Sequence, residues 1–169
     1  MKNIYKGILL LIVFLSASMA AKAQDAEDRK LIAGNSVAYI IPSGSMADTY
    51  THGFGVFAHF DYPIGKYFAW RLDVGWNDIA GDENQYVDVN GQVLTNHPER
   101  TIWEFSTGLQ AKYSVVYVEA RVGYLSSINS VGIIPAVGLR LGRVDLQGSY
   151  TMAGGEEYAS IRLGYYWSK

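Results

Sequence analysis

Residues 68–76 alternate between two kinds of side chain, and this alternation constrains the fold more than any other feature. Every second position is large and apolar, and the set is Phe68, Trp70, Leu72, Val74 and Trp76. The positions between them include Arg71 and Asp73. Successive side chains of a β-strand point to opposite faces, so the segment is predicted to be a strand with one apolar and one polar face. A chain of such strands is predicted to form a barrel with lipid outside and a polar interior.

The first 23 residues have the features of a secretory signal peptide. Lys2 and Lys6 provide the positive start, residues 7–15 form a short apolar core, and Ala21 to Ala23 is a small-x-small cleavage site. A membrane-anchoring helix is the alternative, but such a helix needs about 20 apolar residues to cross a bilayer. We therefore expect export followed by cleavage after Ala23.

Composition narrows the possible partners and the sources of stability. The chain has no cysteine, so neither a disulfide nor a lipid-modified cysteine is expected. Its net charge of −2 argues against a nucleic-acid partner. No motif indicates a catalytic site, a metal or a cofactor. The predicted division is a signal peptide over 1–23, a periplasmic lead-in over 24–34 and a barrel domain over 35–169.

Eight strands are predicted from the alternation and from the turn signals between them. They cover residues 35–41, 52–62, 66–76, 102–113, 116–124, 133–141, 144–151 and 158–167. Three connections are tight (63–65, 114–115 and 142–143), and four are longer (42–51, 77–101, 125–132 and 152–157). Membrane barrels have short turns on the periplasmic side and long loops outside. The predicted fold class is therefore an all-β, antiparallel up-and-down transmembrane barrel of eight strands with a polar lumen.

The longest connection, 77–101, is predicted to contain a small hairpin. Its centre is Asn90-Gly91, a dipeptide that suits a two-residue hairpin turn. Four carboxylates crowd the same loop, namely Asp78, Asp82, Glu83 and Asp88. Oxygen ligands of this kind bind Ca²⁺ in some loops, but a run of acidic residues is more often simply solvated.

The polar faces of the predicted strands carry charges of both signs in equal number. They are Asp61, Arg71, Asp73, Glu104, Lys112, Glu119, Arg121, Arg140, Asp145 and Arg162. Charges buried together must balance, and eight strands enclose a space that side chains fill. We therefore predict a lumen filled by a network of ion pairs rather than an open pore.

Aromatic residues gather at both ends of the apolar faces. The predicted belts comprise Tyr62, Phe68, Tyr113 and Trp167 at the short-turn end, and Trp76, Trp103, Tyr124 and Tyr150 at the long-loop end. The two interfaces of a membrane select such belts. A soluble antiparallel sandwich gives the same alternation of faces, but it does not account for the belts or for the glycines of the polar faces.

The tight turns fix which charges meet within two hairpins. A two-residue turn at Gly142-Arg143 places Arg140 opposite Asp145, and Gly142 suits the first central position of a type II′ turn. A two-residue turn at Ser114-Val115 places Gln110 opposite Glu119. Lys112 is then diagonal to Glu119 and within reach of it.

Two stretches carry a resemblance to a known family. They are Ile134 to Gly142 and Ser160 to Trp167, each alternating small or charged residues with large apolar ones. The chain resembles the eight-stranded OmpA/OmpX-like outer-membrane barrels of Gram-negative bacteria over residues 35–169. The resemblance implies a monomer in the outer membrane, with membrane lipid and the barrel-assembly machinery as partners. Such barrels commonly end on an aromatic assembly signal, whereas Ser168 and Lys169 follow Trp167 here.

The expected role is structural or interactive, through the exposed loops and an unknown surface ligand. One alternative is a soluble secreted or periplasmic barrel that binds a small apolar ligand. Another is a lipid A acyltransferase or deacylase, for which only His52, Ser45 and Asp48 offer a His–Ser–acid set. His59, on a polar face near Asp61, is interpreted as a hydrogen-bonded lumen residue rather than a proton relay.

Overall fold

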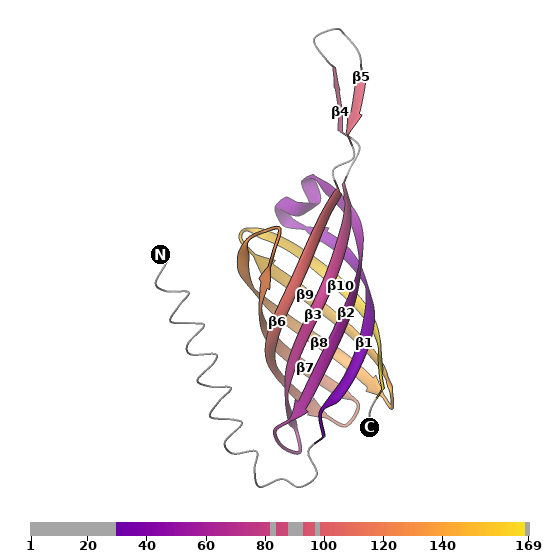
Figure 1. Ribbon diagram of the computed structural model, residues 1–169, viewed down its shortest axis with the longest axis vertical. Coiled ribbons are helices and arrows are strands. Elements are labelled where there is room, and N and C mark those ends of the chain that lie inside the picture. Colours follow the sequence, from indigo (N-terminus) through magenta and orange to yellow (C-terminus); the bar gives the residue numbers. More distant parts are fainter. Residues whose placement is uncertain (1–29, 82–83, 88–92, 97–98, 168–169) are drawn as a thin grey trace, which may run out of the picture.

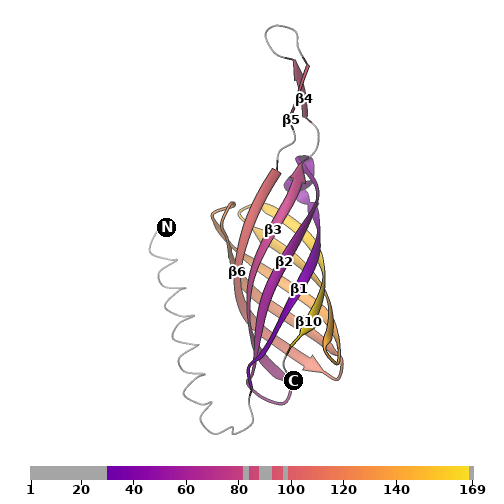
Figure 2. The ribbon, with the colours of Figure 1, turned by 45° about the vertical axis from the view of Figure 1, so that its right-hand side comes forward.

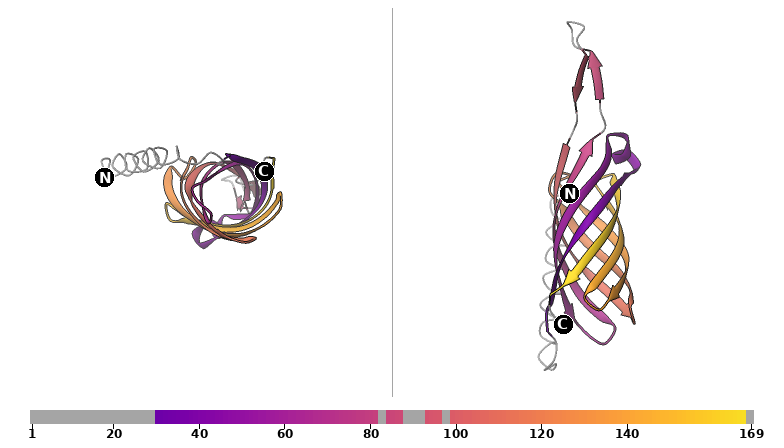
Figure 3. Two further views of the ribbon diagram at one scale, coloured as in Figure 1. Left: turned by 90° about the horizontal axis from the view of Figure 1, so that it is seen from below. Right: turned by 90° about the vertical axis from the view of Figure 1, so that its right-hand side faces the viewer.

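Eight antiparallel strands close into a barrel in the computed structural model, which describes residues 30–81, 84–87, 93–96 and 99–167 (Figure 1). They are β1 (Ile32–Ser43), β2 (Tyr50–Pro63), β3 (Phe68–Gly81), β6 (Glu99–Tyr113), β7 (Val116–Leu125), β8 (Ser130–Leu141), β9 (Val144–Ala153) and β10 (Glu156–Tyr166). Strands that follow one another in this set are paired, including β3 with β6, and β1 pairs with β10 to complete the ring. Seen along its axis, the barrel forms one closed ring of strands (Figure 3). The predicted eight-stranded antiparallel fold is confirmed.

The strands extend further than the alternation of faces predicts. β1 begins at Ile32, so its first residues fall within the predicted lead-in over 24–34. Ile32 pairs with Asp61 of β2, and Gly34 pairs with Tyr166 of β10. β3 likewise continues to Gly81, where it remains paired with β2. Pairing with neighbours, which a single segment does not reveal, sets these ends.

The two tight turns have the predicted register. Arg140 pairs with Asp145 across Gly142-Arg143, and Gly142 has a φ of 65°, as a type II′ turn requires at its first central position. Gln110 pairs with Glu119 across the other turn, where Ser114 has a φ of 55°. A non-glycine residue in this left-handed region is uncommon and reflects the tightness of the turn.

A separate two-stranded sheet lies beyond the barrel at the long-loop end (Figures 1 and 2). It consists of β4 (Asn84–Val87) and β5 (Val93–Asn96), which confirms the predicted hairpin. Val87 pairs with Val93, whereas a two-residue turn at Asn90-Gly91 would pair Val87 with Leu94. The register therefore differs by one residue from the predicted turn, and the turn itself lies outside the described residues.

The interior is layered along the barrel axis. Charged and polar side chains fill the middle, and a cluster of buried apolar residues occupies the long-loop end: Ile40, Met46, Ile79, Ile102, Leu125, Ala153 and Tyr158. Met46 comes from a short 3₁₀ helix, η2 (Gly44–Asp48), and is only 2% exposed. The long connection between β1 and β2 thus contributes an apolar side chain that covers one end of the lumen.

Within the described ranges, no helix is long and apolar enough to cross a membrane.

Candidate functional site

Asp73 lies at the centre of a charged network inside the barrel. Its Oδ1 accepts a hydrogen bond from Arg71 Nε at 2.9 Å. Its Oδ2 accepts one from Arg162 Nη1 at 2.9 Å and another from Arg121. All four side chains are at most 2% exposed. One carboxylate thereby links β3, β7 and β10 across the lumen, although the chain separates Asp73 and Arg162 by 89 residues.

Two glutamates extend the network on either side of Asp73. The ion pair between Arg121 Nε and Glu119 Oε1 is 2.6 Å long, and Arg71 Nη1 donates to Glu119 Oε2 at 3.3 Å. Glu104 accepts from Arg162 Nη2 at 3.3 Å and from Tyr158 at 3.3 Å. Tyr158 also belongs to the apolar cluster, so the charged layer and the apolar layer meet at its ring.

A second group of charges lies toward the short-turn end. Arg140 Nη2 donates to Asp61 Oδ2 at 2.6 Å, and its guanidinium carbon stands 3.9 Å from the centre of the Tyr166 ring. Tyr166 donates to Asp61 Oδ2 at 2.8 Å. Asp145 accepts from Tyr117 at 2.8 Å and lies 3.6 Å from Arg140 Nε. Tyr166 therefore shares its Asp61 oxygen with Arg140, whereas Tyr117 satisfies an Asp145 oxygen that Arg140 does not contact.

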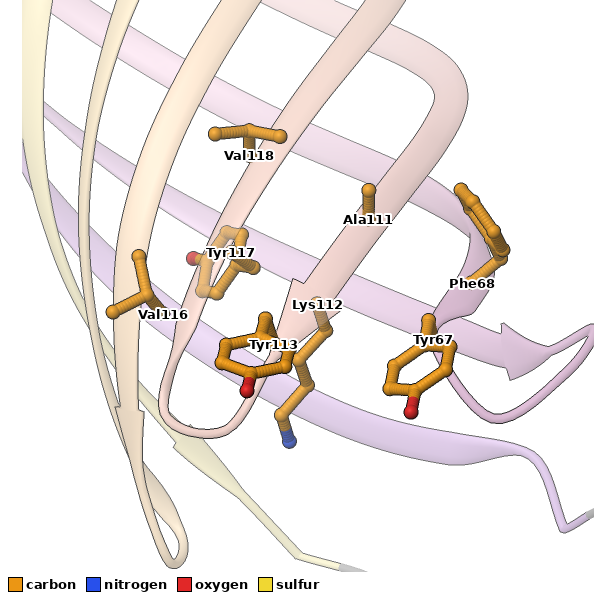
Figure 4. Close-up of a pocket in the computed structure, with 8 residues that line it drawn as sticks. All are labelled: Tyr67, Phe68, Ala111, Lys112, Tyr113, Val116, Tyr117 and Val118. Atoms are coloured by element: carbon orange, nitrogen blue, oxygen red, sulfur yellow. The ribbon is translucent and has the colours of Figure 1, made fainter.

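The buried charges do not balance exactly. The described lumen holds four arginines and five carboxylates: Arg71, Arg121, Arg140 and Arg162 with Asp61, Asp73, Glu104, Glu119 and Asp145. Lys112, predicted to pair with Glu119, takes part in none of the ion pairs recorded among the described residues. It lies at the mouth of the barrel between the tyrosines of the short-turn end (Figure 4). A lysine at the end of a strand can extend its ammonium group toward solvent, so Lys112 forms no such ion pair although the charges of Arg140, Asp61 and Asp145 still act on it.

Four aromatic side chains share the lumen with the charges, and the sequence analysis did not identify them. They are Phe57, Tyr117, Tyr158 and Tyr166, each at most 4% exposed. All four lie on the same alternating positions as the charges of their strands. Applying the two-residue period to every position of those strands would therefore have predicted them to face the lumen. His59 is fully buried in the same space, with its ring centre 4.6 Å from that of Tyr166. Its ring nitrogens make no hydrogen bond with the described residues, in contrast to the predicted role.

Gly75 leaves the space that the Phe57 ring occupies. A Cβ at position 75 would overlap that ring, whose centre lies 3.5 Å from the guanidinium carbon of Arg162. Gly75→Ala is therefore expected to destabilise the barrel by about 1–3 kcal/mol, the usual cost of overpacking a core. Denaturant titration of the variant measures this loss. In a protein that already carries Phe57→Ala, adding Gly75→Ala should cost little further stability. An equal loss from Gly75→Ala in the two backgrounds would contradict the proposed overlap.

The outer surface of the barrel is apolar over its whole middle. Its exposed residues include Val37, Phe54, Val56, Leu72, Phe105, Leu109, Val118, Val137, Leu139, Ile161 and Leu163, which are between 40% and 61% exposed. A protein in water rarely exposes a contiguous apolar patch larger than a few hundred Å². This chain exposes apolar side chains and buries charged ones, which is the reverse of the arrangement in a water-soluble protein. The fold is an eight-stranded transmembrane β-barrel.

The structure puts the aromatic residues of the predicted belts on this outer surface. Phe68, Tyr113 and Trp167 lie at the short-turn end and are 56%, 78% and 57% exposed, and Tyr62, also outward-facing, is half-buried. The remaining four lie toward the long-loop end: Trp76, Trp103, Tyr124 and Tyr150.

Residues considered for chemistry are not assembled into a site. His52 faces outward and lies near Tyr39 and Phe54, while the Ser45 hydroxyl donates to the Gly155 carbonyl at 2.8 Å. Asp48 is exposed in η2, and no recorded interaction joins it to His52 or Ser45.

The acidic loop considered for Ca²⁺ is described only in part. Asp78 accepts a hydrogen bond from Thr101 at 3.2 Å, whereas Asp82, Glu83 and Asp88 lie outside the described residues. Among the described side chains, no group of three or more His, Cys, Asp or Glu residues is placed to hold a metal ion.

Comparisons with known proteins return barrels of the same size. No family model and no curated protein matches the chain. Neisserial surface protein A (NspA) is similar in structure, with 12% identity and a TM-score of 0.47, over 83% of this chain and 98% of that one. Ail, the attachment invasion locus protein of Yersinia pestis, crystallised with the heparin analogue sucrose octasulfate, has 12% identity and a TM-score of 0.45, over 82% and 97%. A designed transmembrane β-barrel has 16% identity and a TM-score of 0.45, over 80% and 94%.

Proposed function

We propose that this chain is an outer-membrane barrel of a Gram-negative bacterium, with a closed polar interior and a structural or surface-interaction role carried by its long-loop end. The observation behind the proposal is the separation of the two surfaces. Nine charged side chains are buried in the described lumen, and the outside between the aromatic belts is apolar. A charge facing lipid at the middle of a bilayer costs about 2–4 kcal/mol, so only the interior tolerates this many.

Side chains, rather than a channel, occupy the interior. Arg71 and Arg121 cross the middle of the lumen and are each 1% exposed. Met46 and the apolar cluster lie above them. A barrel of eight strands has an interior just wide enough for side chains to fill. We expect no steady conductance from the purified protein in a planar bilayer, and a wide, stable pore would overturn the closed interior.

The long-loop end has the features of a surface for interaction. β3 and β6 continue beyond the aromatic residues Trp76 and Trp103, and the β4–β5 hairpin extends this end further (Figure 2). At the opposite end, the connections that the structure describes between strands are short, namely 64–67, 114–115 and 142–143. Loops on a rigid scaffold commonly carry binding functions, and membrane barrels direct their long loops outward.

Epitope insertion tests this orientation in intact cells. A short epitope inserted between Gly154 and Gly155, in the β9–β10 turn, should be stained by antibody without permeabilisation. The matched insertion between Gly142 and Arg143 should be stained only after the outer membrane is opened. The reverse pattern would overturn the proposed orientation. A protein recovered only from the soluble fraction, with no heat-dependent shift in gel mobility, would overturn the membrane assignment itself.

The two alternatives receive less support. A soluble barrel for a small apolar ligand needs an apolar interior, whereas the middle of this lumen is charged. A lipid A-modifying enzyme needs its nucleophile and base within hydrogen-bond reach, and no such contact joins Ser45 to His52. If cells carrying the His52→Ala or Ser45→Ala variant have the same lipid A as wild-type cells, the enzyme hypothesis is contradicted.

A further inference from the structure

We propose that the short-turn end of the barrel holds an anionic phospholipid in a groove formed by β3, β6 and β7. The short-turn end is the end formed by the turns at 64–67, 114–115 and 142–143. The inference rests on the proposed membrane location and adds a lipid site to it. The partner is a phospholipid whose headgroup carries a net negative charge.

Charges outside the lumen are segregated between the two ends of the barrel. Among the described residues, the cations at the short-turn end are Lys30, Lys66, Lys112 and Arg143. The described carboxylates outside the lumen are Asp48, Asp78, Glu99, Glu156 and Glu157, and all of them lie at the long-loop end. Arg100 is the one described cation there, and it is paired with Glu156 at 2.5 Å. Among the described residues outside the lumen, the short-turn end therefore carries cations without carboxylates, and the lumen carboxylates Asp61 and Asp145 are the described acidic groups that act on Lys112.

A groove of about 680 Å³ opens at this end, and its exposed lining is almost entirely apolar. Tyr67 and Tyr113 stand at its lower edge with stacked rings 6.5 Å apart, and Lys112 extends between them (Figure 4). Lys66 Nζ lies 5.2 Å from the centre of the Tyr67 ring. Lys112 and the two tyrosines thus line one edge of an otherwise apolar groove, and the Lys66 ammonium group lies beside one of these tyrosines.

The groove continues into the surface that faces the acyl chains. Phe68, Val116 and Val118 line it and are 56%, 44% and 56% exposed on the outside of the barrel. A phospholipid fits both halves, because its acyl chain can follow these side chains while its phosphate meets Lys66 and Lys112. Lysine ammonium groups bind phosphate through charge-assisted hydrogen bonds, and tyrosine at an interface combines an apolar ring with a polar hydroxyl. A protein partner outside the membrane accounts for less of the groove. It could contact the charged edge, but the apolar half of the groove would still face lipid.

Native mass spectrometry of the folded barrel tests the site. Protein extracted from the membrane is mixed in detergent with equal amounts of phosphatidylglycerol and phosphatidylcholine that carry the same acyl chains. We expect phosphatidylglycerol to be retained preferentially on the wild type. Lys66→Gln with Lys112→Gln should lower this preference about fivefold for each cation removed, since a basic residue near an anionic surface contributes roughly that factor.

Arg143→Gln is the matched control, because it removes a cation from the same end but from the β8–β9 turn, which contributes no residue to the groove lining, whereas Lys66 adjoins the lining residue Tyr67. It should leave the preference nearly unchanged. Equal retention of the two lipids by the wild type, or an equal loss in Arg143→Gln and in the double variant, would overturn the groove as a site. A dimer in the same spectra that excludes lipid from the groove would also overturn it.

The heat-dependent shift in gel mobility distinguishes a failure of the lipid site from a failure of the proposed membrane barrel. A wild type that gives no mobility shift contradicts the membrane barrel, whereas a shifted band without lipid preference contradicts only the phospholipid site. Lys66→Gln alone supports the same test if the double variant does not fold, because Lys66 lies in an exposed turn outside every barrel strand.

Discussion

Replacing Arg121 by methionine is expected to destabilise the folded barrel by about 3–5 kcal/mol at neutral pH, the typical cost of removing one partner from a buried ion pair. Arg121 is 1% exposed and contacts Asp73, Glu119 and Glu104. Methionine fills a similar length without charge, so the variant would bury five carboxylates against three arginines. The free energy of unfolding is measured by denaturant titration of the protein in micelles, with tryptophan fluorescence and the gel shift as readouts.

Arg143→Met makes the same chemical change at an exposed position of the short-turn end. Arg143 donates to the Tyr165 hydroxyl at 3.2 Å on the surface, and exposed interactions of this kind contribute about 1 kcal/mol or less. A loss in Arg121→Met no larger than that in Arg143→Met would show that the lumen network does not need this charge.

The cost of Arg121→Met should shrink as the pH falls. The wild-type lumen holds one more carboxylate than arginine, and the variant holds two more. Proton uptake neutralises the excess carboxylates, and the folded variant gains more from it than the folded wild type does. The difference in unfolding free energy between variant and wild type should therefore be largest at neutral pH and smaller in acid. A difference independent of pH would assign the loss to packing rather than to charge.

Leu72→Arg has the second large expected effect, and it acts on the outside of the barrel. Leu72 is 40% exposed and lies midway along β3 between the aromatic residues Phe68 and Trp76. An arginine facing lipid at mid-bilayer costs about 2–4 kcal/mol. We expect the variant to be depleted from the outer-membrane fraction and to lose most of its heat-shifted band.

Val115→Arg provides the comparison for this effect, because it introduces the same side chain into the tight turn between β6 and β7. That position lies at the water-facing end, so assembly should be close to wild type. Equal assembly of Leu72→Arg and Val115→Arg would contradict the lipid-facing assignment of Leu72. Arg71→Leu should insert better than Leu72→Arg, although it leaves Asp73 and Glu119 with fewer buried partners.

Local pattern was sufficient to predict the two faces of the strands that carry charges and the registers at the tight turns, whereas residues 35–41 gave no clear separation of faces. The alternation through Arg71 and Asp73 assigned both to the inside, because a strand has a period of two. The glycine at position 142 identified a turn type that fixes Arg140 opposite Asp145. Strict use of the same parity would also have placed Tyr117 and Tyr166 in the lumen. These features depend on residues that are close in the chain.

Partners across the lumen could be known only from the tertiary structure. Asp73 meets Arg121 and Arg162, which lie 48 and 89 residues away in the chain, because closing the ring brings β3, β7 and β10 around one interior. Strand pairing likewise determined that β1 begins at Ile32. Because β6 ends at Tyr113, Lys112 lies at the mouth of the barrel and does not pair with Glu119. The sequence by itself thus determined which side of each charge-bearing strand is polar, since backbone geometry alone sets the alternation. Only barrel closure decided which charges meet, because those distances depend on the strand order and the stagger of the whole ring.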